Sequence, residues 1–166
     1  TTIVPSPDRP PRRRGCLSLV PARPRPPPRV PVVDDVPDAR LLVGAMIESY
    51  CEAQVTLVAS VDEAMDSVRR VIPDLVVTDA VMRRMGGREL LRTMRARGYT
   101  MPVILMTGHD PERHRGTSGF AATIRKPFDP AQASRIVKAV IEGDLASAAD
   151  TMHEGSAEAK VDVNVS

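Results

Sequence analysis

The sequence predicts an α/β fold, a doubly wound five-stranded parallel sheet that lies between two layers of helices as a three-layer sandwich. Between residues 30 and 142, short apolar runs alternate five times with segments of helical periodicity, which is the pattern of repeated βα units. This block carries fifteen basic and fifteen acidic residues and is long enough to bury one core. Aromatic residues make up 2% of the chain, so the core is expected to consist of Val, Ile, Leu, Met and Ala.

The first two units begin with runs rich in β-branched residues. VPVVD, at 30–34, reads as a buried strand, and QVTLVA, at 54–59, as the next one. Between them, 37–50 is expected to be a helix, and 61–71 another. On the first helix, the expected apolar face consists of Leu41, Leu42, Ala45 and Met46.

The remaining units follow the same alternation. Strands are expected at 74–79, 103–108 and 121–128, and helices at 87–97 and 129–143. VILMTG is a continuous apolar run typical of a parallel strand covered on both faces. In the last helix Asp129 is placed to cap the first turn, Pro130 suits the first turn itself, and Gly143 lies where the helix ends. The segment between Thr107 and Lys126 is polar and holds three Gly, so any fourth helix there is expected to be one turn or absent.

The two flanks differ from the block in composition. Residues 1–29 hold seven Arg, one Asp and no Lys, and are rich in Pro, which predicts a disordered or polyproline-like extension. A basic arm that contacts nucleic acid or acidic lipid is a second interpretation, without the interleaved aromatic residues that would strengthen it. Residues 143–166 carry five acids and one Lys and are expected to form a flexible acidic tail, too short for a DNA-binding domain.

Two Cys in no recognisable pattern, and no apolar run of about 20 residues, favour a cytoplasmic protein without a membrane segment. We therefore expect three parts: the extension 1–29, the folded block 30–142 and the tail 143–166.

Polar residues are expected where the apolar strands end. Asp34 and Asp35 follow the first strand, Asp79 the third, Thr107 the fourth and Lys126 the fifth. Ligands of such sheets bind outside the carboxyl ends of the strands, and carboxylates that converge there need a cation nearby. Hard oxygen ligands suit Mg²⁺, and a carboxylate beside it can act as a nucleophile toward phosphorus. Helix capping is the simpler interpretation of the acidic pair alone, but it does not account for Asp79 and Lys126.

The block VPVVDD…DLVVTDAVM…VILMTG…IRKPF resembles the receiver domain of bacterial two-component response regulators, a flavodoxin-like fold, over roughly residues 30–142. The resemblance implies that Asp79 is the phosphoacceptor, that Asp34, Asp35, Asp79 and the Val81 backbone carbonyl hold Mg²⁺, and that Thr107 and Lys126 contact the phosphate. It also implies a cis Lys126–Pro127 peptide bond.

The partners that the resemblance implies are a histidine kinase or phosphotransfer protein as the donor and a downstream protein as the receiver of the signal. With the tail read as too short for a DNA-binding domain, a stand-alone receiver that signals through protein contact is expected, without multiple turnover.

The chain departs from the family pattern in two places. Arg83 stands where the family usually has Pro, followed by Gly86 and Gly87, which suggests a more flexible and more basic loop. Thr123 replaces the aromatic residue that usually lies three positions before the Lys, so we expect the chemistry to be retained and the output to differ. His109, two positions after Thr107, is a candidate to influence water attack and more simply a surface residue.

Two other functions stay open. A phosphatase that uses Asp79 as its nucleophile would usually carry a second Asp two residues later, where this chain has Val81. A degenerate receiver that serves as a binding scaffold is compatible with the altered loops, but not favoured by the complete set of Asp, Thr and Lys.

Overall fold

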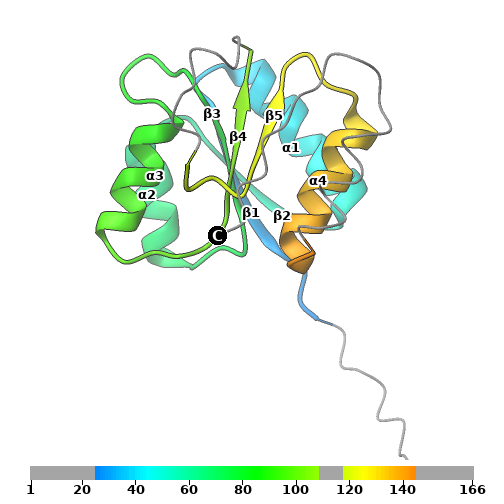
Figure 1. Cartoon of the computed structure of the whole chain (residues 1–166), viewed down its shortest axis with the longest axis horizontal. Helices are drawn as coiled ribbons and strands as arrows, with labels where there is room; N and C mark the ends of the chain where they lie inside the picture. Colours follow the sequence, from blue (N-terminus) through cyan, green and yellow to red (C-terminus); the bar gives the residue numbers. More distant parts are fainter. Residues whose placement is uncertain (1–24, 109–117, 145–166) are drawn as a thin grey trace, which may run out of the picture.

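The computed structural model describes residues 25–108 and 118–144 of the 166-residue chain. In chain order the elements are β1 (Arg29–Val33), α1 (Pro37–Cys51), β2 (Gln54–Val58), α2 (Val61–Arg70), β3 (Val76–Asp79), α3 (Gly87–Ala96), β4 (Val103–Thr107), β5 (Ala122–Arg125) and α4 (Pro130–Glu142). The five strands are parallel and lie in the order β2-β1-β3-β4-β5. This confirms the predicted doubly wound sheet (Figure 1).

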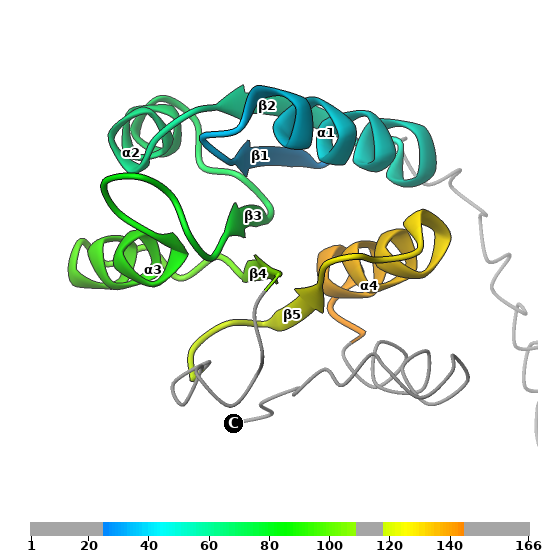
Figure 2. The same cartoon turned by 90° about the horizontal axis from the view of Figure 1, so that it is seen from above.

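The sheet is covered on both faces. Helices α1 and α4 pack on one side and α2 and α3 on the other, as the view from above shows (Figure 2). Alternate strand residues supply the two cores: Ile104 and Met106 belong to the cluster beneath α1 and α4, whereas Val103 and Leu105 belong to the cluster beneath α2 and α3. Because both faces are covered, β4 is buried along its whole length.

The topology fixes where a site can lie. The chain leaves β1 toward the edge strand β2 and then returns across β1 to form β3. The direction of winding therefore reverses between β1 and β3, and the crevice outside their carboxyl ends is the usual ligand site of such sheets. Asp34 follows β1 and Asp79 ends β3.

The predicted apolar face of α1 is wrong. Leu41 and Leu42 are 57% and 65% exposed, and Ala45 is also exposed, whereas the buried residues are Val43, Gly44, Met46, Ile47 and Cys51. The helix is apolar on more than one side, so the spacing of its apolar residues did not identify the side that packs. Gly44 marks that side, because a Cβ there would lie 2.7 Å from Leu57 Cδ2.

The last helix follows the sequence prediction closely. Asp129 is its N-cap and accepts a hydrogen bond from the Gln132 N–H at 2.7 Å, Pro130 lies in the first turn, and Gly143 ends the helix with a φ of 75°. The Lys126–Pro127 peptide bond is cis, as the resemblance implied.

Some predictions concern residues outside the described ranges. The shortened fourth helix and His109 fall on 109–117, most of the basic extension falls on 1–24, and most of the acidic tail on 145–166. Among the residues that are described, no helix combines the length and the hydropathy needed to cross a bilayer.

Candidate functional site

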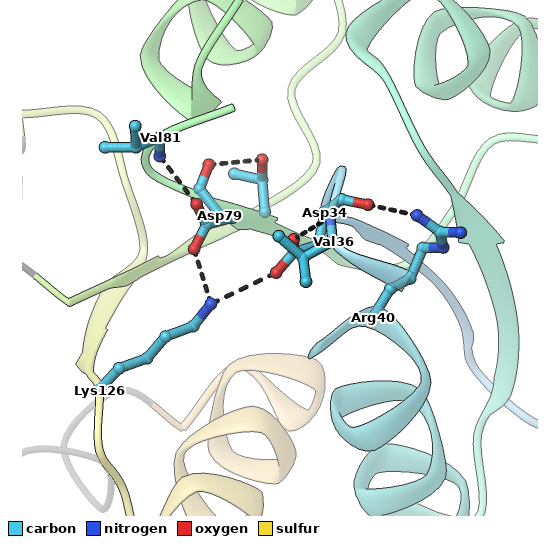
Figure 3. A network of polar contacts seen from close by, with 7 residues as sticks. Asp34, Val36, Arg40, Asp79, Val81 and Lys126 are labelled. Carbon is cyan, nitrogen blue, oxygen red and sulfur yellow. Dashed lines mark hydrogen bonds and ion pairs between the residues drawn. The ribbon is translucent and has the colours of Figure 1, made fainter. Parts of the chain in front are cut away.

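The centre of the candidate site is an ammonium group held between two carboxylates. Lys126 Nζ donates to Asp79 Oδ1 at 2.7 Å and to Asp34 Oδ2 at 3.3 Å, so one cation links the ends of β1, β3 and β5 (Figure 3). The three side chains are 28%, 14% and 5% exposed for Lys126, Asp79 and Asp34. We call these three residues the inner network.

The inner network holds Lys126 in its charged form. Burial by itself lowers the pKa of this Lys, but the hydrogen bond and charge of Asp79, together with Asp34, outweigh burial and raise the pKa above its ordinary value. The ammonium is therefore a fixed positive charge beside the Asp79 carboxylate at neutral pH.

Backbone N–H groups orient the same two carboxylates. Asp34 Oδ1 accepts from the Val36 N–H, and Asp79 Oδ2 accepts from the Val81 N–H, both at 2.9 Å. The N-cap residue of α1 is Val36, and no side chain caps that helix end. Helix capping therefore does not account for the acidic pair. These N–H contacts could not be read from the sequence, because they depend on the turn that follows each strand.

Asp35 lies apart from the inner network. Its Oδ2 accepts from the Arg83 N–H at 2.9 Å and lies 3.7 Å from Arg83 Nε. The Arg83 side chain is 89% exposed and that of Asp35 18%, so we call this pair the rim. Proline has no N–H to donate, and an arginine at this position therefore adds the donor that holds Asp35. The substitution was visible in the sequence, but its contact with Asp35 was not foreseen.

The loop that carries Arg83 returns close to the end of β3. A Cβ at Gly87 would lie 2.6 Å from the Asp79 carbonyl oxygen, and one at Gly86 2.4 Å from the Ala80 carbonyl oxygen. Both φ and ψ of Gly86 are in the extended range, so its role is close approach and not an unusual backbone angle. The two glycines let α3 begin against the strand end that presents Asp79.

Thr107 and Thr123 lie on the neighbouring strands. Thr107 ends β4 and is 4% exposed, and its carbonyl accepts from the Lys126 N–H at 2.7 Å, which ties the strand end to the residue that carries the ammonium. Thr123 lies on β5, and its hydroxyl oxygen is buried without a hydrogen-bond partner in the described part of the chain.

The donor atoms fit Mg²⁺ in kind. Two carboxylates converge at the inner network and Asp35 follows directly in the chain, and Mg²⁺ is usually held by one or two carboxylates with waters and phosphate oxygens completing its shell. No group of three His, Cys, Asp or Glu residues within the described ranges is close enough to hold a metal, because Asp35 is turned to Arg83. Asp34, Asp35, Asp79 and the Val81 carbonyl remain the residues that would hold the ion.

Comparison with known proteins agrees with this geometry. Residues 30–140 match the response regulator receiver domain family. The chain is 34% identical over 121 residues to response regulator Rre1 of Synechocystis, covering 70% of this chain and 52% of Rre1. It therefore spans about half the length of that relative. It is also 38% identical over 112 residues to an uncharacterized 14.6 kDa protein of Leptolyngbya boryana, covering 64% of this chain and 85% of that protein.

A solved structure supports the same relationship. The response regulator receiver protein of Burkholderia phymatum is 31% identical, with a TM-score of 0.60, over 69% of this chain and 95% of the other. The family match, the order of the strands and the inner network at their carboxyl ends agree: the chain belongs to the receiver domains of two-component response regulators.

Proposed function

We propose that this chain accepts a phosphoryl group on Asp79 and passes the signal on by protein contact. The observation that carries the proposal is the 2.7 Å contact between Lys126 Nζ and Asp79 Oδ1, because it places a fixed cation beside the carboxylate that would become the acyl phosphate. The donor would be a histidine kinase or a phosphotransfer protein.

The transfer is a displacement at phosphorus. A carboxylate oxygen of Asp79 attacks the phosphorus of a phosphohistidine, the new P–O bond forms, and the P–N bond breaks with its electron pair remaining on the imidazole. Lys126 stabilises the charge on the phosphoryl oxygens, and the Thr107 hydroxyl donates to one of them. Bound Mg²⁺, held by Asp34, Asp35, Asp79 and the Val81 carbonyl, would supply further neutralisation of that charge.

The surface beside the site suits a protein donor. The groove between α1 and the start of α4 is lined by Leu42, Ala45, Met46, Phe128 and Lys126, so the residue that contacts Asp79 also borders an apolar groove. Leu41 and Leu42 are exposed next to it, and exposed apolar surface of this kind is typical of protein contact sites. We infer that the phosphodonor protein docks here.

A hydrolase is the less favoured function. Val81, the position at which a phosphatase of this kind would place its acid and base, is 62% exposed and apolar. It therefore supplies no group to activate water. A binding scaffold without phosphorylation is the other alternative, and it would leave the inner network without a chemical role.

Incubation with acetyl phosphate and Mg²⁺, followed by intact-mass measurement and an assay for released phosphate, tests the three functions. We expect a mass increase of one phosphoryl group, lost in Asp79→Asn and retained in Asp66→Asn, which removes an exposed carboxylate on α2. Continuous phosphate release without an adduct would support a hydrolase, and the absence of both would support a scaffold.

A further inference from the structure

The surface formed by α3 and the loop before it carries an excess of positive charge. Arg83, Arg84, Arg88, Arg92, Arg95 and Arg97 are all exposed, and Glu89 is the one acidic residue between positions 80 and 100. Arg83 belongs to the rim of the site, and we call the other five arginines the basic face. It lies on the opposite side of the sheet from α1 and α4 (Figure 2).

Helical periodicity places three of these arginines in one row. Arg88, Arg92 and Arg95 are spaced i, i+4 and i+7, opposite the buried Leu90, Leu91 and Met94. At 1.5 Å per residue the row from Arg88 to Arg95 spans about 10 Å. Like charges at this spacing repel one another by a few tenths of a kcal/mol per pair, so the row does not serve the stability of the helix.

The contacts within the protein leave most donors of the row available. Arg92 pairs with Glu89, and Arg95 Nη1 donates to the Tyr99 carbonyl at 2.8 Å. A guanidinium carries five N–H donors, and one contact uses only one or two of them. The acids of the neighbouring α2 have their own partners, since Asp66 pairs with Arg69 and Glu63 accepts from the Ala59 N–H.

The residues between the arginines indicate the class of partner. The exposed large hydrophobic residues of the described ranges include none between Gly86 and Thr100. A stable protein interface has an apolar core, and a helix that lies on a membrane inserts an apolar face. A nucleic-acid backbone requires neither, because phosphates are bound by charge and by the planar forks of arginine.

We propose that the basic face binds the phosphate backbone of nucleic acid without reading the bases. The extension at 1–29, with seven Arg and one Asp, is a second basic segment of the same chain that can add phosphate contacts. This binding goes beyond the proposed phosphoacceptor function and does not depend on it, because the row from Arg88 to Arg95 takes no part in the inner network.

Fluorescence anisotropy of the full chain with a labelled mixed-sequence DNA duplex tests the proposal. The variant Arg92→Gln/Arg95→Gln removes two charges from the row, and Arg135→Gln/Lys138→Gln removes two exposed charges from α4 on the opposite face. Each lost phosphate contact lowers the slope of log K against log salt by about 0.9. We expect the α3 variant to reduce the slope by about 2 and the affinity about tenfold, and the α4 variant to change both little.

Further arms make the result decisive. Arg92→Lys/Arg95→Lys should retain most of the salt slope, because the charge remains. Equal effects of the α3 and α4 variants would show that net charge alone drives binding and would overturn the proposal. Tighter binding to phosphatidylserine vesicles or to a poly-glutamate peptide than to DNA at equal charge concentration would also overturn it, as would no measurable DNA binding at low salt.

Discussion

The inner network and the rim are two ion-pair systems at the same edge of the sheet, and they differ in burial. Lys126, Asp34 and Asp79 are 28%, 5% and 14% exposed, whereas Arg83 and Asp35 are 89% and 18% exposed. In the inner network one cation serves two carboxylates whose other oxygens accept backbone N–H groups. In the rim, a solvated guanidinium lies 3.7 Å from one oxygen.

The difference in burial decides which interaction matters for stability. An exposed ion pair contributes at most about 1 kcal/mol because water screens it, whereas removing one partner from a buried pair leaves an uncompensated charge and costs several kcal/mol. The inner network is therefore the preformed part of the site. The rim is the part whose side chains can rearrange at little cost.

Lys126→Met gives the largest expected effect. The substitution keeps most of the side-chain volume and removes the cation between Asp34 and Asp79. In Mg²⁺-free buffer we expect the free energy of unfolding to fall by about 2–4 kcal/mol, somewhat less than for a fully buried pair because Lys126 is partly exposed. Urea denaturation measures this change. Lys138→Met, at an exposed position of α4, should change the free energy by less than about 0.5 kcal/mol.

Magnesium sharpens the same comparison. The ion should raise the melting temperature of Lys126→Met more than that of the wild type, since it would neutralise the same carboxylates. Equal stability of Lys126→Met and wild type in Mg²⁺-free buffer would contradict the assignment of the inner network as the preformed part.

The pH dependence follows from the raised pKa of Lys126. A cation whose pKa is higher in the folded state stabilises the fold fully below its pKa in the unfolded chain, about 10.4 for Lys. That contribution disappears as pH rises through the higher folded value. The stability gap between wild type and Lys126→Met should therefore be constant from about pH 7 to 9 and narrow above about pH 10.4, as measured by urea denaturation. A gap that narrows below pH 9 would contradict the raised pKa.

Gly87→Ala should have an intermediate effect. The added Cβ would meet the Asp79 carbonyl oxygen at 2.6 Å and Thr78 Cγ2 at 2.8 Å, so α3 must shift away from β3. We expect a loss of about 1–3 kcal/mol, the usual range for overpacking, measured by thermal and urea unfolding. At Gly108 a new Cβ would have its nearest neighbour 4.0 Å away. A Gly108→Ala variant as destabilised as Gly87→Ala would show that the close contact is not the cause.

Arg83→Ala should have the smallest effect. It removes the exposed guanidinium but keeps the backbone N–H that binds Asp35, so stability should change by less than about 0.5 kcal/mol. Isothermal titration calorimetry should give a Mg²⁺ affinity within about threefold of wild type, with Arg84→Ala as the matched charge control. A loss of more than 1 kcal/mol would show that the rim is as important for stability as the inner network.

The sequence predicted the strands and the residues at their ends because both depend on local patterns. A continuous apolar run such as VILMTG has few other interpretations, and the order of elements places Asp34, Asp79 and Lys126 at one edge. The buried face of α1 was predicted wrongly because Leu41 and Leu42 are as apolar as the residues that pack. The separation of Asp35 from the inner network depends on the path of the Arg83 loop, which no local pattern specifies.

The most direct test of the central claim is to locate the phosphoryl group. Borohydride reduces an aspartyl phosphate to homoserine, so treatment of the acetyl phosphate-labelled chain followed by peptide mass spectrometry identifies the acceptor residue. The account predicts homoserine at position 79 and unmodified Asp at positions 34 and 35. Homoserine at 34 or 35, or an Asp79 that stays unmodified while the chain carries phosphate, would contradict it.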